Sequence, residues 1–224
     1  MRRLAGFLAG IPFLAGCFLL PSGESSRVKD VPEELKRSGV VAPPVVDRHL
    51  YGDVAGLRTG QWARYREGGG LLTLAVVGAE EGGVWVEVVE EGETRLVSAR
   101  LVAPGGVVKK AFYGEVSKGS RSAVVPQPLQ QWTEPPPGLR EVSREGGEER
   151  CAVGGRDLLA QRVRIRFEDL EGRLAEEVWL WHPEVPPVYA GSGLGGLVRK
   201  RAGSRQVDLV DFGNDARPLL EIPR

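Results

Sequence analysis

The sequence predicts a mainly β protein, an antiparallel sheet of about eight to nine strands with few helices. Apolar and polar residues alternate with a period of two over much of residues 57–213, as in half-buried strands. Glycine-rich turns separate these runs in a chain that holds 31 glycines and 16 prolines. Because short turns join antiparallel neighbours, the pattern indicates a series of hairpins.

Residues 1–16 are typical of a bacterial lipoprotein signal peptide. Two arginines open the segment, and the apolar run behind them is shorter than the roughly 20 residues that span a bilayer. Small residues then precede a cysteine, whose thiolate is the nucleophile that accepts a diacylglyceryl group. An ordinary signal peptide with a chance cysteine, or a buried helix, is the alternative. The cleavage motif is Leu14, Ala15 and Gly16, and the lipidated residue is Cys17.

The composition divides the rest of the chain into three parts. Residues 17–49 are rich in Ser, Glu, Lys and Pro, which favours a lipidated N-terminus and flexible tether. Residues 50–215 are expected to form a single antiparallel β domain, and residues 216–224 a C-terminal tail. The formal net charge of zero argues against a nucleic-acid partner, since a phosphate backbone demands a basic excess.

Four strands are expected in the first half of the domain, at 71–79, 84–90, 94–103 and 107–113. Strand 71–79 is almost wholly apolar and is therefore expected to be well covered. Strand 84–90 alternates. Val84, Val86 and Val88 share one of its faces, and Trp85, Glu87 and Val89 share the other.

Residues 117–150 are expected to form a proline-rich insertion around Trp132. Pro126, Pro128 and the three prolines at 135–137 cannot occupy a central strand. The length of the segment favours a lid or an interaction loop, and a poorly ordered insertion is the alternative.

A hairpin is expected at residues 162–181. Arginines at 162, 164 and 166 alternate with apolar residues, so one face is apolar and the other basic. A four-residue turn at 169–172 would pair Arg162 with Trp179 and place Glu176 opposite Ile165 on the apolar face. The predicted inward residues are Val163, Ile165, Phe167, Leu174, Val178 and Leu180. The last strands are expected at 196–201 and 205–212.

The chain is expected not to be an enzyme and to need no metal or cofactor. His49 and His182 are isolated, and two histidines alone do not make a metal site. Once Cys17 is lipidated, Cys151 has no partner cysteine, and it also lacks metal-type spacing. A buried, inert thiol is therefore expected. Residues 191–196 fit a dinucleotide-binding glycine pattern formally, but no strand precedes them and no convincing helix follows.

Aromatic residues on the expected strands are consistent with either of two structures. Packing in the core explains them directly, whereas an apolar ligand cavity in a curved sheet is the functional alternative. An acid among them would need a partner or water. The possible cavity residues are Trp62, Tyr65, Trp85, Glu176, Trp179 and Trp181.

Several segments resemble a family of uncharacterised bacterial envelope lipoproteins. Residues 60–65 resemble its opening Gly-x-Trp-x-x-Tyr strand, and residues 153–156, 181–186, 196–199 and 207–213 resemble its later segments. Those proteins are thought to be similar to the half-barrel of the LolA/LolB-like lipoprotein carriers and receptors. The resemblance implies a curved antiparallel sheet or half-barrel with an apolar concave face, and it transfers no functional residue.

Together these observations predict a lipid-anchored, non-catalytic protein of the bacterial cell envelope. Phe18 stands where an aspartate would signal retention in the inner membrane, which favours the outer membrane, facing the periplasm. The expected partner is an apolar ligand or lipid. The alternative is a structural or protein–protein interaction module that uses the tether, the Trp132 loop and the arginine stripe.

Overall fold

The computed structural model describes residues 42–46, 54, 56–117, 120–121, 123–131, 139–189, 191–192 and 195–222. Cys17, its cleavage motif, most of the predicted tether, His49 and Trp132 lie outside the described residues. Over the described ranges the regular structure consists of strands without a helix. Accordingly, none of these ranges contains a helix of the length and apolarity that crossing a membrane requires.

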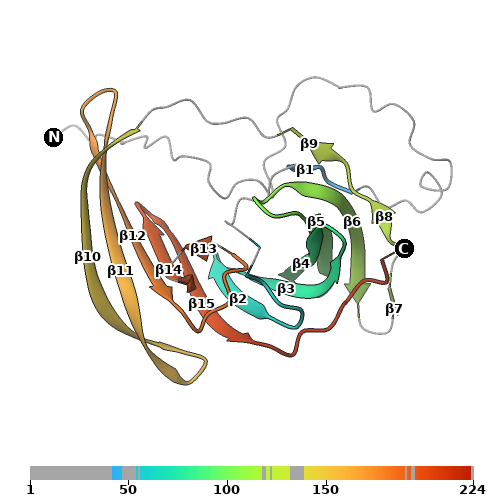
Figure 1. Ribbon diagram of the computed structural model, residues 1–224. Helices are drawn as coiled ribbons and strands as arrows, with labels where there is room; N and C mark the ends of the chain where they lie inside the picture. The colour runs from blue at the N-terminus through green and yellow to red at the C-terminus, as the bar shows by residue number, and fades with distance from the viewer. Residues whose placement is uncertain are drawn as a thin grey trace.

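Fifteen strands make one large sheet and one two-stranded sheet (Figure 1). They are β1 (Val45–Val46), β2 (Trp62–Glu67), β3 (Gly70–Glu80), β4 (Gly83–Glu91), β5 (Arg95–Val102), β6 (Val108–Ser117), β7 (Ser120–Arg121), β8 (Val125–Pro126), β9 (Leu129–Gln130), β10 (Leu139–Val153), β11 (Arg156–Asp169), β12 (Leu174–His182), β13 (Gly191–Ser192), β14 (Gly195–Ala202) and β15 (Arg205–Gly213).

The large sheet is open, curved and antiparallel throughout. Eleven of its strands follow the order β10-β11-β12-β14-β15-β2-β3-β4-β5-β6-β7, while β8 pairs with β6 and β13 pairs with β14. Strands β1 and β9 form the small parallel sheet. The prediction of a mainly β, antiparallel protein is confirmed, but the number of strands is larger than the predicted eight or nine.

Part of this difference comes from β10, which includes residues 139–150 of the predicted insertion. These residues pair along their length with β11 and form the edge of the sheet. The sequence hides the strand because its side chains are mostly charged, and Gly146 and Gly147 interrupt the alternation. Charged side chains are a common feature of edge strands, where they discourage pairing with other chains.

The β11–β12 hairpin forms with a register one residue away from the prediction. Ile165 pairs with Glu177 and Arg162 pairs with Leu180, so Glu176 lies opposite Arg166 instead of Ile165. The backbone N–H of Asp169 donates to the Arg173 carbonyl oxygen at 3.0 Å and closes a three-residue turn. Asp169 Oδ1 accepts hydrogen bonds from the backbone N–H groups of Glu171 and Arg173, at 2.8 and 2.9 Å. Gly172, with φ of +77°, supplies the left-handed residue that such three-residue hairpins contain.

The shifted register separates the six residues predicted to face inward. Val163, Ile165 and Phe167 share a face with Glu177 and Trp179, because paired residues project to the same side of a sheet. The other three residues share the opposite face with the arginines of β11, although Leu180 is still buried. These three are Leu174, Val178 and Leu180.

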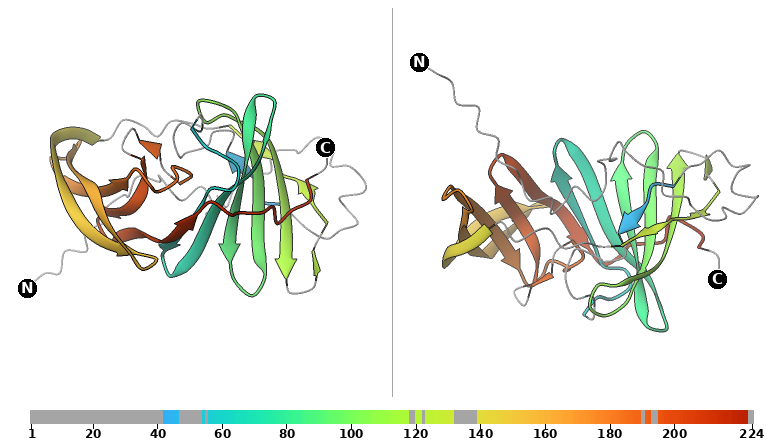
Figure 2. Two further views of the ribbon diagram at one scale, coloured as in Figure 1. Left: turned by 60° about the horizontal axis from the view of Figure 1, so that its bottom comes forward. Right: turned by 90° about the horizontal axis from the view of Figure 1, so that it is seen from above.

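The two faces of strands β2–β6 have different covers. One face carries Tyr65, Leu74, Val76, Val86 and Val88 in the main apolar cluster, and we call it the tyrosine face. The opposite face carries the second apolar cluster and is covered by residues 214–222, so we call it the tail face. Figure 2 shows this C-terminal segment crossing the strands from β15 towards β6.

Directional polar contacts fix the C-terminal segment to the tail face. Trp62 Nε1 donates to Asp215 Oδ1 at 2.7 Å, and the buried Glu87 carboxylate accepts from the N–H groups of Leu219 and Leu220 at 2.9 and 3.0 Å. Leu220 lies so close to β6 that a Cβ at Gly114 would be 2.8 Å from its Cδ2 atom. Residues predicted as a C-terminal tail therefore contribute side chains to the core.

Candidate functional site

The sequence-predicted aromatic residues all lie on strands, but they divide between the two faces. Trp62 and Trp85 pack with the second apolar cluster, on the face covered by the C-terminal segment. Tyr65, Trp179 and Trp181 belong to the tyrosine face, and Tyr65 and Trp181 are buried in the main cluster. The five rings therefore do not line one cavity. A ligand site that uses them is confined to the tyrosine face.

A buried lysine is the centre of the first polar group on that face. Lys200 is 7% exposed, and its Nζ lies 4.0 Å from the ring centroid of Trp179 and 3.7 Å from Glu177 Oε1. Trp179 Nε1 donates to Glu177 Oε2 at 2.9 Å. The Trp179 ring stacks on the Trp181 ring, with ring centroids 5.3 Å apart. Burial lowers the pKa of Lys200, and the nearby Glu177 carboxylate opposes that shift.

The lysine group continues towards β2. Burial raises the pKa of Glu67, and Arg205 and a hydrogen bond from Tyr189 act in the opposite direction. Tyr189 packs on Tyr65 with ring centroids 4.6 Å apart, and the Tyr65 hydroxyl donates to the Leu197 carbonyl oxygen at 3.1 Å. Complete burial raises the pKa of Tyr65. This end of the face is thus a packed mixture of aromatic rings and charges.

Glu176 is not part of this group, which corrects its prediction as a cavity residue. Its carboxylate lies 3.3 Å from Arg166 Nε and 3.6 Å from Arg164 Nε, on the face opposite Trp179. The acid that occupies the predicted place among apolar residues is its neighbour Glu177, because of the one-residue register shift. The arginine stripe is therefore matched by acids on β10 and β12, including Glu145.

A second polar group lies on the tyrosine face of β5. Arg100 is 7% exposed, and its Nε donates to Ser98 Oγ at 3.0 Å. The Ser98 hydroxyl donates to Gln127 Oε1 at 2.6 Å, and Gln127 Nε2 donates to the Pro43 carbonyl oxygen at 2.8 Å. Through this relay, β5 holds Pro43, which lies within the predicted tether of residues 17–49.

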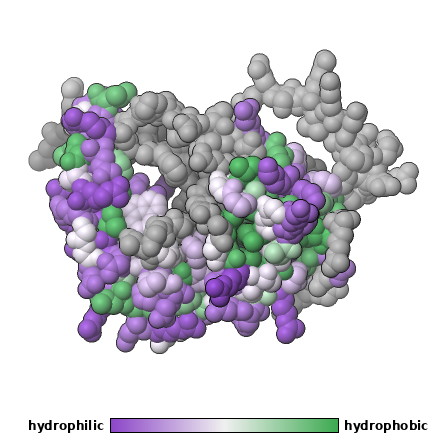
Figure 3. All heavy atoms as spheres, viewed as in Figure 1, coloured by the Kyte–Doolittle hydropathy of each residue, from purple (hydrophilic) through white to green (hydrophobic). Residues whose placement is uncertain are grey.

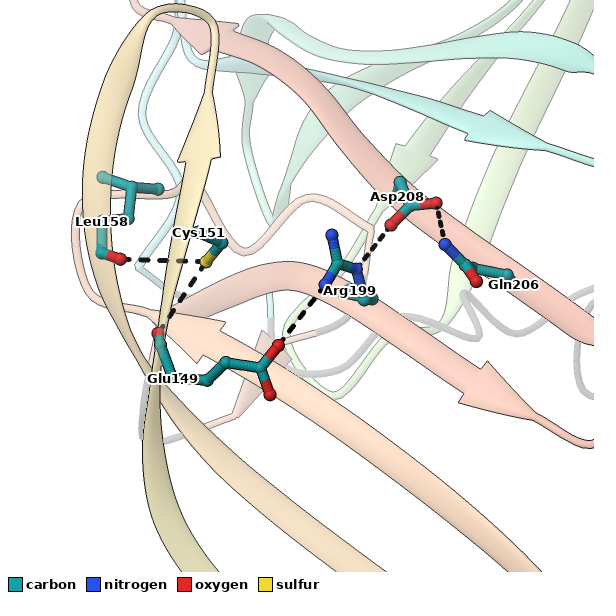
Figure 4. Close-up of polar contacts among 6 residues, drawn as sticks. All are labelled: Glu149, Cys151, Leu158, Arg199, Gln206 and Asp208. Atoms are coloured by element: carbon teal, nitrogen blue, oxygen red, sulfur yellow. Dashed lines mark hydrogen bonds and ion pairs between the residues drawn. The ribbon is translucent and has the colours of Figure 1, made fainter.

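The opposite face of β14 carries an ion-pair network that lies beside the free cysteine, Cys151 (Figure 4). Arg199 bridges Asp208 Oδ1 at 2.6 Å and Glu149 Oε1 at 3.4 Å. Cys151 lies beside Glu149 and is partly buried, and that burial raises the pKa of its thiol. A raised pKa favours the protonated thiol, which is the less nucleophilic form.

Sequence reasoning missed Arg100, Gln127 and Lys200. A signal for Ser98 and Arg100 is present in the sequence, because they are two polar residues at i and i+2 on an otherwise apolar face of one strand. The sequence holds no such signal for Gln127 and Lys200, since their partners come from distant parts of the chain. The described residues contain no group of three or more His, Cys, Asp or Glu side chains that could hold a metal ion.

Comparison with models of protein families, with curated protein sequences and with solved structures found no match.

Proposed function

We propose that the protein is a lipid-anchored, non-catalytic component of the bacterial cell envelope that binds an apolar ligand or lipid on its tyrosine face. The observation that carries the proposal is the presence of two buried cations on the tyrosine face, whereas the buried acid of the tail face, Glu87, is paired with the C-terminal segment. The tail face is covered by the chain's own C-terminal segment. The tyrosine face combines apolar strands with two buried cations, Lys200 and Arg100.

Such a face has the composition of a site for small amphiphilic molecules. Those sites are mostly apolar and contain a few placed polar groups that fix the orientation of the ligand. Lys200 and Arg100 are held by hydrogen bonds or by an aromatic ring, so their positions are determined by the fold. The raised pKa of the Cys151 thiol supports the non-catalytic part of the proposal.

The anchor in this proposal is Cys17, and the domain end of the tether is the Pro43 contact with Gln127. These residues are 26 positions apart. A chain of that length spans at most about 90 Å when fully extended. The sheet would therefore act close to the membrane surface. Incorporation of labelled palmitate that is lost in Cys17→Ala is expected, and incorporation that persists in that variant would reject the anchor.

Native mass spectrometry of the protein extracted from membranes in mild detergent tests the ligand. We expect a lipid or other apolar molecule to remain bound to the wild-type protein and to be reduced in Trp179→Ala, because that ring borders Lys200. Trp62→Ala is the matched control, since Trp62 is an aromatic residue on the tail face. Equal loss in both variants, or a wild-type protein without any bound molecule, would contradict ligand binding on the tyrosine face.

A protein–protein interaction module is the second candidate. Leu170 and Leu174, at the end of the β11–β12 hairpin, are 89% and 68% exposed, and Val142 on the neighbouring β10 is also exposed. Figure 3 shows hydrophobic atoms at the upper left, where this hairpin ends in Figure 1. Exposed apolar groups of this kind are common at interaction surfaces.

Photo-crosslinking in intact cells separates this candidate from the first. A crosslinking residue at Leu170 is expected to capture one specific envelope protein if the hairpin end is an interface. Leu159 is the matched control, because it is 48% exposed on the same strand pair but far from the hairpin end. Identical crosslinks from both positions would reject the interface.

A further inference from the structure

Arg100 is held rigidly on the tyrosine face with only part of its guanidinium engaged. It pairs with Val86 on β4 and Ala111 on β6, so its immediate neighbours across the sheet are apolar. Its Nε–H is committed to Ser98, whose hydroxyl is in turn committed to Gln127. The Gln127 amide is anchored on Pro43. This chain of donors and acceptors fixes the direction in which the two Nη nitrogens point.

The Nη nitrogens of Arg100 have no hydrogen bond or ion pair with another residue in the described part of the chain. Arg100 is only 7% exposed, so its guanidinium is largely removed from water. Taking a guanidinium out of water is unfavourable unless an anion or further hydrogen bonds compensate. The fold therefore supplies a fixed, largely desolvated cation without its own counterion.

Glu90 is the acid that interacts with Arg100 over a longer range. The two side chains form no ion pair among the described residues, and burial raises the pKa of Glu90 although Arg100 opposes that shift. Glu90 is therefore a charge at longer range and not an ion-pair partner of Arg100. By contrast, Lys200 on the other polar group has Glu177 within ion-pair distance. This difference distinguishes the two buried cations and points to Arg100.

We propose that Arg100 binds the oxyanion headgroup, a carboxylate or a phosphate, of the ligand held on the tyrosine face. Because Nε is engaged by Ser98, the oxyanion approaches end-on and accepts hydrogen bonds from both Nη nitrogens. Planar guanidinium donors suit this two-oxygen geometry better than an ammonium group does. The inference rests on the proposed function, since it names the chemical class of the ligand for the same face.

Binding of a fluorescent fatty acid, cis-parinaric acid, and of its methyl ester to the full-length protein tests the proposal. The acid is expected to bind at least about tenfold more tightly than the ester, as a charge-assisted pair of hydrogen bonds would give. Arg100→Gln is expected to abolish this difference by weakening the binding of the acid. Arg95→Gln, an exposed arginine on the opposite face of the same strand, is the matched control.

The outcomes separate this inference from the proposed function. If acid and ester bind equally to the wild-type protein, the oxyanion site is overturned while ligand binding stands. If neither of them binds, and phosphatidate and inorganic phosphate do not bind either, both proposals fail. A parallel titration with phosphatidate and with inorganic phosphate distinguishes a lipid headgroup from a free anion. Binding of inorganic phosphate alone would retain the oxyanion site and overturn the apolar ligand.

A measurement on the wild-type protein guards against misfolding of the variant. In nitrogen-15 NMR spectra, the Arg100 Nη–H resonances are expected to shift when the acid is added and to stay in place with the ester. Unchanged resonances in a sample saturated with the acid would overturn the proposal without any substitution.

Discussion

Strands β3–β6 and strands β10–β12 belong to one sheet but are stabilised in different ways. In β4, residues 85–89 are all buried, since the tyrosine face and the tail face are both covered. In β10–β12 the exposed side chains are largely Arg and Glu, and they form ion pairs across the strands. Apolar burial contributes about 25 cal/mol per Å², whereas an exposed ion pair contributes about 0–1 kcal/mol. Stability is therefore concentrated in β3–β6 and depends on the C-terminal segment.

The substitution Leu220→Ala is expected to cause the largest loss of stability. The side chain is buried against β6 beside Gly114, and shortening it removes apolar contact and leaves a cavity. The free energy of unfolding, measured by urea denaturation, should fall by about 2–4 kcal/mol.

Leu174→Ala is the matched control in β10–β12. Its side chain is largely exposed, so the same chemical change should alter the unfolding free energy by less than about 0.5 kcal/mol. Similar losses in the two variants would break the comparison.

A somewhat smaller effect is expected for Glu87→Gln. The substitution keeps the shape of the side chain but replaces the charged acceptor for the N–H groups of Leu219 and Leu220. Hydrogen bonds to charged groups contribute about 1.5–3 kcal/mol, and a neutral amide retains part of that.

Hydrogen exchange of the Leu219 and Leu220 amides measures this effect directly. Both amides should exchange faster in Glu87→Gln, while amides of β11 keep their wild-type rates. Faster exchange throughout the sheet would show a global loss of stability instead of a local release of the C-terminal segment.

The same contrast explains how much of the fold the sequence predicts. In β3–β6, apolar alternation between glycine turns locates each strand, and the assignment of Trp85 and Glu87 to one face of β4 is confirmed. In β10 the prediction of an insertion was wrong, because charged residues and two glycines give no apolar period. Backbone pairing with β11 defines that strand, and pairing between distant residues leaves little trace in one sequence.

The candidate site shows the same limit at the level of single side chains. The prediction that Glu176 lies opposite Ile165 was wrong, because the turn at Asp169 gives a register in which Glu177 takes that position. Arg100 depends on Gln127 and Pro43, which are distant in sequence and come together only in the folded chain.

Lys200 lies on β14, between the two regions, and should give stability a measurable pH dependence. Burial lowers its pKa in the folded protein below the value of about 10.5 expected when unfolded. Between these two pKa values the unfolded chain binds more protons, so the free energy of unfolding should rise with pH.

The comparison with Lys200→Met isolates this dependence. The stability of the wild-type protein relative to the variant should rise by at most about 1.4 kcal/mol per pH unit as the pH approaches 10.5. Tyr65 also has a shifted pKa, but it is present in both proteins and cancels from the difference. A difference that is flat or falls with pH would contradict the burial of a charged Lys200.

The smallest effect on stability is expected at the half-exposed ion pair between Arg166 of β11 and Glu176 of β12. The Arg166 Nε and Glu176 Oε2 atoms are 3.3 Å apart, and both side chains are nearly half exposed. A double-mutant cycle built from Arg166→Ala and Glu176→Ala should give a coupling of about 0.2–1 kcal/mol. Glu176 also lies 3.6 Å from Arg164, which retains part of the interaction in Arg166→Ala and keeps the coupling small.

Salt provides the control for this last prediction. The Debye length, over which salt screens exposed charges, falls to about 3 Å at 1 M ionic strength. The coupling should therefore decline towards zero as sodium chloride is raised from roughly 0.05 M to roughly 1 M. The loss caused by Leu220→Ala should persist over the same range, because apolar burial is not screened. A coupling above about 2 kcal/mol that resists salt would mean that the ion pairs carry the stability of β10–β12 themselves. Stability would then not be concentrated in β3–β6, because ion pairs would stabilise β10–β12 as apolar burial stabilises β3–β6.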